Sequence, residues 1–81
     1  MNPERLVEMA NDIANFFAAD PDREAATDGM CDHLKKFWEP RMRQQILAYL
    51  HDHDGAGMSE LARAAVVRLG EREAAAGKTP A

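Results

Sequence analysis

The sequence is poor in cysteine, in long apolar runs and in basic charge, and each scarcity excludes a class of protein. Its single cysteine, Cys31, cannot form a disulfide within the chain, which excludes the disulfide frameworks of small secreted domains. No apolar run approaches the roughly 20 residues that a membrane-spanning helix needs. Ten basic residues against fourteen acidic ones give a net charge of −4, the wrong sign for a general phosphate binder. The N-terminal segment shows no secretory signal, so we expect a cytoplasmic protein without membrane contact.

The chain length allows one small domain. A core built from 81 residues is near the lower limit for independent stability. Binding to a partner would add to that stability. No segment alternates apolar and polar residues with the period of two that strands show. We therefore predict an all-α fold, with about four short helices in one small compact domain over residues 1–70 and a disordered or frayed tail over residues 71–81. The pattern does not choose between an up-and-down bundle and a more irregular packing.

Capping residues and prolines mark where the helices begin. The predicted helices run from Pro3 to about Ala19, from the Asp20–Pro21 turn to Trp38 or Glu39, from Pro40 to the segment HDHDGAG, and from Ser59 to Gly70. Their expected apolar faces hold Leu6, Met9, Ile13, Phe16 and Phe17; then Ala26, Met30, Leu34 and Phe37; then Met42, Ile46, Tyr49 and Leu50; and finally Leu61, Ala65 and Leu69.

The residues that could carry chemistry have unsuitable spacings. Cys31 and His33, like His51 and His53, are two positions apart, and such residues point about 200° from each other on a helix. Helical metal ligands need a separation of three or four. The sequence also lacks a glycine-flanked serine and a phosphate-binding glycine loop. We therefore predict no metal site, no catalytic residues and no cofactor in this chain.

The segment KKFWEPRMRQQ, from Lys35 to Gln45, differs from the rest of the chain. Residues 33–43 carry four bases and one acid, whereas residues 1–32 carry two bases and eight acids. Pro40 must end one helix and open the next. Phe37 and Trp38 point about 100° apart on the preceding turn, so one of them is left for a partner unless the turn wraps it.

Arg41 and Arg43 lie in the first turn of the following helix, where the helix dipole disfavours cations. We expect both to be exposed and to meet an acidic partner. One alternative is that they pair with the acidic surface of the first or second helix. Another is that residues 35–43 form the basic patch of a small helical nucleic-acid-binding regulator, although three net charges give a weak phosphate footprint.

The same segment resembles a known family. His33, Phe37, Trp38, Glu39, Pro40, Arg41, Met42 and Arg43 resemble the signature H-x-x-x-F-W-[D/E]-P-R-M-R of the delta subunit of soluble, NAD-dependent, molybdenum-containing formate dehydrogenases. The flanking segments LVEMANDIANFFAADPDREAA and GAGMSELARAAV are similar to the opening and closing parts of that family. The resemblance covers roughly residues 3–70.

The resemblance implies a non-catalytic accessory subunit. In such complexes the large catalytic subunit carries the molybdenum pterin cofactor and iron–sulfur clusters, and other subunits carry flavin mononucleotide (FMN) and the NAD site. The implied role is cofactor insertion, assembly or stability, through docking on the large subunit and without nucleic acid. The residues expected to bind the partner, or to support the fold beneath, are His33, Phe37, Trp38, Arg41, Met42 and Arg43.

Overall fold

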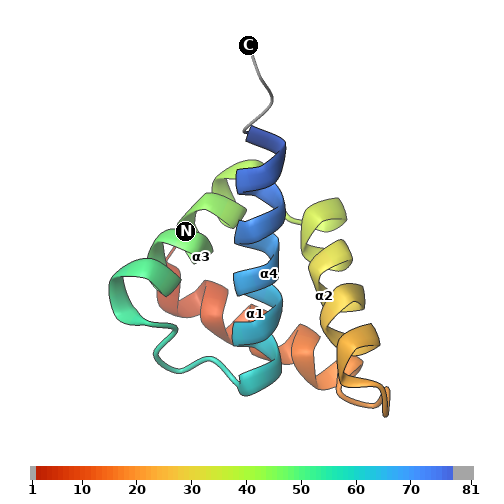
Figure 1. Ribbon diagram of the computed structural model, residues 1–81. Helices are drawn as coiled ribbons and strands as arrows, with labels where there is room; N and C mark the ends of the chain where they lie inside the picture. Colours follow the sequence, from red (N-terminus) through yellow and green to blue (C-terminus); the bar gives the residue numbers. More distant parts are fainter. Residues whose placement is uncertain (1, 78–81) are drawn as a thin grey trace.

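The computed structural model describes residues 2–77, and this part of the chain contains four helices and no strand. They are α1 (Pro3–Phe17), α2 (Arg23–Phe37), α3 (Pro40–His53) and α4 (Glu60–Gly77), shown in Figure 1. The all-α prediction is confirmed.

The helix starts follow the capping residues. The Asn2 side-chain oxygen accepts a hydrogen bond from the Glu4 amide at 2.9 Å, and Pro3 and Pro40 each occupy the first turn of a helix. The cap of α2 is Asp22, whose carboxylate accepts from two backbone amides, and not Asp20 as predicted. Asp20 instead accepts from the Asp22 amide and shapes the turn before it.

The last helix is longer than predicted. It does not stop at Gly70 but continues to Gly77, so residues 71–77 of the expected tail are helical. Residues 78–81 lie outside the described part of the chain. Gly70 has a packing role, because a Cβ at this position would lie 3.0 Å from the Leu47 side chain of α3. The extension also brings Arg72 and Glu73 into ion pairs with other helices.

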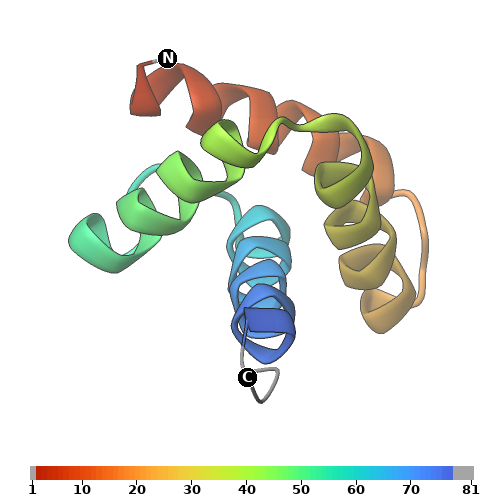
Figure 2. The ribbon, with the colours of Figure 1, turned by 90° about the horizontal axis from the view of Figure 1, so that it is seen from above.

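The packing is irregular and not an up-and-down bundle. In the two views of Figures 1 and 2, α4 stands between α2 and α3, and α1 crosses behind them. Helices α2 and α4 run in the same direction. Their ion pairs show this, since Arg23 meets Glu60 near both helix starts and Asp32 meets Arg72 farther along both helices.

Small side chains occupy much of the core. Ala10 and Ala14 of α1 and Ala62 and Ala65 of α4 are buried. The other buried apolar residues are Leu6, Val7, Ala26, Met30, Cys31, Leu34, Trp38, Ile46, Leu61, Val66 and Leu69. The buried face of α1 is therefore rotated from the predicted one.

The prediction of a core-facing side chain is wrong for two residues. Phe16 of α1 is 76% exposed and Phe37 of α2 is 71% exposed, although both were expected to face the core. The buried positions of α1 are Leu6, Val7, Ala10 and Ala14, and only Leu6 belongs to the predicted face.

Ion pairs connect α2 to α4 along one side, and we call them the α2–α4 ladder. Arg68 contacts Glu24 at 2.9 Å and Asp28 at 2.8 Å, and Arg72 contacts Asp28 at 2.7 Å and Asp32 at 3.2 Å. The hydrogen bond from Arg68 lowers the pKa of Asp28, and the same bond raises the pKa of Arg68. Much of the acidic charge of α2 is thus matched by α4.

The ladder predicts a specific dependence of stability on pH. Because Asp28 is ionised more readily in the folded chain, its contribution is present above the ordinary aspartate pKa of about 3.9 and is lost as pH falls through the lowered value. We expect Asp28→Asn to be less stable than the wild type at pH 7, with the difference shrinking in acid. Urea unfolding between about pH 7 and pH 2.5 measures it.

Asp12→Asn is the matched control, because Asp12 is an exposed carboxylate without an ion pair in the described residues. Its effect on the free energy of unfolding is expected to be small throughout. If the free energy of unfolding of Asp28→Asn stays below that of the wild type by the same amount down to the lowest pH, the carboxylate charge is not what stabilises this contact.

Candidate partner-binding surface

The turn between α2 and α3, which we call the elbow (residues 37–40), separates the two adjacent aromatic residues. Trp38 adopts an extended conformation at the end of α2, and its amide still donates to the Leu34 carbonyl at 3.0 Å. Its side chain is buried, with 5% exposed, whereas Phe37 points to solvent. The prediction that one aromatic is left over is confirmed, and that residue is Phe37.

Arg43 is not the exposed residue that was predicted. Only 17% of its side chain is exposed, and its Nε lies 2.8 Å from a Glu73 carboxylate oxygen on α4. Its Nη1 donates to the carbonyl oxygens of Lys35 at 2.8 Å and Trp38 at 3.0 Å. These carbonyls belong to the last turn of α2 and to the elbow, where helical acceptors lack partners. Arg43 therefore ties α2, α3 and α4 together.

The other predicted residues of this segment divide between fold and surface. Met42 is half-buried and packs against the core, as Trp38 does. Arg41 is exposed, as predicted, and it forms no ion pair within residues 2–77. His33 is half-buried on α2, one turn before Phe37.

Four rings form a continuous surface across α1 and α2, which we call the aromatic row. The ring centroids of Phe16 and Phe17 are 5.3 Å apart, those of Phe17 and His33 are 6.0 Å apart, and those of His33 and Phe37 are 4.7 Å apart. Gly29 makes room for this arrangement, because a Cβ there would lie 2.8 Å from the Phe17 ring. The glycine thus lets an α1 ring lie directly on α2.

A shallow hollow adjoins the α1 end of the row. It has a volume of about 350 Å³ and is lined by Asp12, Ile13, Phe16, Phe17 and His33. Asp12 is the only carboxylate among these lining residues. The hollow is therefore an apolar depression suited to a side chain of another molecule.

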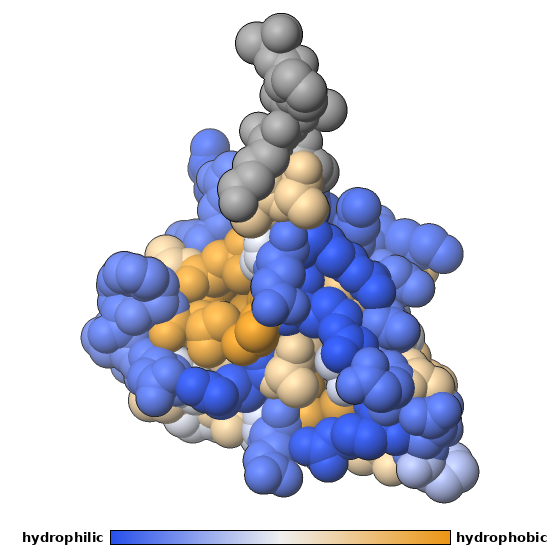
Figure 3. Space-filling view, viewed as in Figure 1, coloured by the Kyte–Doolittle hydropathy of each residue, from blue (hydrophilic) through white to orange (hydrophobic). Residues whose placement is uncertain are grey.

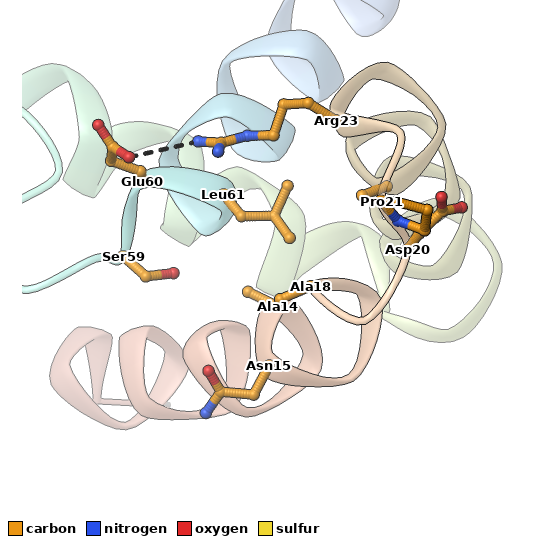
Figure 4. Close-up of a pocket in the computed structure, with 10 residues that line it drawn as sticks. Ala14, Asn15, Ala18, Asp20, Pro21, Arg23, Ser59, Glu60 and Leu61 are labelled. Carbon is orange, nitrogen blue, oxygen red and sulfur yellow. Dashed lines mark ion pairs between the residues drawn. The ribbon is translucent and has the colours of Figure 1, made fainter.

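A second depression lies where α2 and α4 begin, against α1 (Figure 4). Its volume is about 450 Å³, and Leu61 and Ala14 lie in its middle. Arg23 and Glu60 form an ion pair of 3.5 Å beside it. The Ser59 hydroxyl accepts from the Ala62 amide. These polar groups are engaged with each other or with the helix starts.

A third apolar area appears between α3 and α4 in Figure 3. Leu47 and Leu50 of α3 are partly buried, and Val67 of α4 is 38% exposed. Leu47 fits against Gly70, and Leu50 lies beside Gly55. Much of this area is the outer edge of the core.

The other histidines and the cysteine contact neighbouring side chains. His51 contacts Asp52 at 3.1 Å, and the His53 ring packs on Tyr49 with centroids 4.8 Å apart. Cys31 is buried with its sulfur 3.5 Å from Arg72, and burial raises the pKa of its thiol. Within residues 2–77, no three His, Cys, Asp or Glu side chains are grouped to hold a metal ion. Over the same range, no helix is both long and apolar enough to cross a bilayer.

These features define a small all-helical domain whose most distinctive surface is a row of four rings with an exposed phenylalanine, Phe16 or Phe37, at each end. The family described as NADH-dependent formate dehydrogenase delta subunit, FdsD, matches residues 5–66. That match covers most of the chain, and the chain belongs to this family. It confirms the resemblance drawn from the sequence. No curated protein and no solved structure matches the chain significantly.

The two neighbouring aromatics are predicted to respond differently to truncation. Trp38→Ala removes a buried side chain and is expected to lower the free energy of unfolding by about 3–5 kcal/mol. Phe37→Ala is expected to change it by less than about 1 kcal/mol, because most of that ring is in solvent. Urea unfolding followed by circular dichroism compares them. Equal losses from the two variants would contradict the assignment of Trp38 to the core and Phe37 to the surface.

Proposed function

We propose that this chain is a non-catalytic accessory subunit that docks on the large molybdenum-bearing subunit of formate dehydrogenase. In this proposal it supports assembly or stability of the complex, or insertion of the molybdenum pterin cofactor. The molybdenum, iron–sulfur and FMN groups belong to other subunits. The observation that carries the proposal is the family match over residues 5–66, which includes both helices of the aromatic row and the elbow.

The structure supports two different roles, fold support and partner binding, for the residues of the signature segment. Trp38, Met42 and Arg43 serve the fold, since they are packed against the core or paired with α4. His33 and Phe37 belong instead to the aromatic row. Exposed aromatic rings are unfavourable in water and are enriched where protein partners bind. We therefore assign docking to the row and fold support to the buried members of the signature.

Co-expression with the large subunit tests this proposal. Phe16→Ala combined with Phe37→Ala is expected to lower recovery of the complex strongly, because truncating an aromatic residue at the centre of an interface often costs about 2 kcal/mol or more of binding free energy. The measurements are the amount of large subunit recovered on the tagged chain, its molybdenum content and its formate-dependent reduction of NAD. Both lost rings are exposed, so the variant is expected to fold.

Val67→Ala is the matched control, since it also removes exposed apolar surface but on α4. It is expected to leave recovery unchanged. A wild-type chain that never retains the large subunit would rule out docking. A double phenylalanine variant that retains it fully, with full molybdenum content, would place the docking surface elsewhere.

A further inference from the structure

In the part of the chain that the structure describes, the lysine and arginine side chains without an ion pair are concentrated at one place. Six arginines of the described range pair with carboxylates: Arg5, Arg23, Arg43, Arg63, Arg68 and Arg72. Within residues 2–77, only Lys35, Lys36 and Arg41 form no such pair, and all three are exposed. They lie within seven residues of sequence around Phe37, and we call them the elbow cations.

The elbow cations are next to one end of the aromatic row. Lys36 directly precedes Phe37 and lies three positions after His33, so Lys36 and His33 are neighbours on the α2 surface. Arg41 follows on the first turn of α3. The row thus has positive charge at its elbow end and the apolar hollow at its α1 end, where Phe16 is most exposed.

We infer that this composite surface binds an acidic, amphipathic segment of the partner protein. Carboxylates of that segment lie against Lys36 and Arg41, and one of its apolar side chains enters the hollow beside Phe16 and His33. The charge complementarity sets the direction in which the segment crosses α2 and α1. This inference rests on the proposed docking function and names the chemistry of the surface that is recognised.

The charges favour an acidic protein segment over a nucleic acid. Three unpaired cations would neutralise only about three phosphates, which gives weak binding at physiological salt. Glu39 lies between the cations in sequence, and Asp12 lines the hollow, so a continuous phosphate backbone would meet carboxylates along the surface. A protein segment can place an apolar side chain near Asp12 and carboxylates only at the elbow.

Charge reversal at the elbow tests the inference. Affinity of the purified large subunit for the chain is measured between about 50 mM and 300 mM salt, a range over which electrostatic screening strengthens. Lys36→Glu combined with Arg41→Glu is expected to weaken binding at low salt by at least about tenfold, mainly through slower association. The affinity of the wild type is expected to fall as salt is added, whereas the affinity of the double variant is not expected to fall.

Arg5→Glu is the control, because Arg5 is an exposed cation about three turns along α1 from Phe16. It is expected to bind like the wild type. The double reversal is also expected to fold, since Arg41→Glu suits the helix dipole at the start of α3 and offsets the unfavourable Lys36→Glu in the last turn of α2; thermal unfolding of the isolated variant verifies this.

The outcomes separate this inference from the docking function. If the wild type binds the large subunit and the double reversal binds equally well with the same salt dependence, the acidic-segment inference is wrong while docking stands. If the wild type does not bind it, both fail. Tight, salt-sensitive binding of a DNA duplex of about 20 base pairs by the wild type, lost in the double reversal, would overturn the inference in favour of nucleic acid.

Discussion

A core with little apolar volume is the constraint on which the rest of this structure depends. Ala10 and Ala14 of α1 and Ala62 and Ala65 of α4 are buried, so much of the core is made of side chains with a single carbon atom. Each buried methyl contributes only about 0.8 kcal/mol. The large rings of Phe16 and Phe37 remain outside this core. A partner that covers the rings would add the apolar burial that the core lacks.

Charge pairing decides which residues remain available for recognition. The acids of α2 meet Arg68 and Arg72 of α4, and Arg43, although it lies in the most basic segment of the sequence, is committed to Glu73. The net charge of a sequence segment therefore differs from the charge that is left to bind a partner. After these pairs are formed, the unpaired lysines and arginine of residues 2–77 are the elbow cations, beside the aromatic row. The apolar and charged parts of the proposed docking surface thus follow from how the helices pack.

Much of the fold could be predicted from local signals. The capping side chains of Asn2 and Ser59 and the prolines at positions 3 and 40 act on their own helix ends, so they report helix starts directly. Helix faces and helix C-terminal ends could be predicted less accurately than helix starts, because they depend on neighbouring helices. In the sequence Gly70 has the character of a helix end, but in the structure it packs against Leu47. Trp38 rather than Phe37 turns inward because the chain leaves α2 at Trp38. For the candidate site, the signature located Phe37 and His33, but no local pattern indicated that Phe16 and Phe17 lie beside them.

Docking through the aromatic row requires that Phe16 and Phe37 are open to solvent in the isolated chain and covered in the complex. Hydroxyl-radical footprinting with mass spectrometry measures it directly, by comparing oxidation of Phe16 and Phe37 in the free chain and in the complex with the large subunit. We predict rapid oxidation of both rings in the free chain and protection of both in the complex, with Tyr49 on α3 unchanged. Equal oxidation of the two phenylalanines in both states would contradict it.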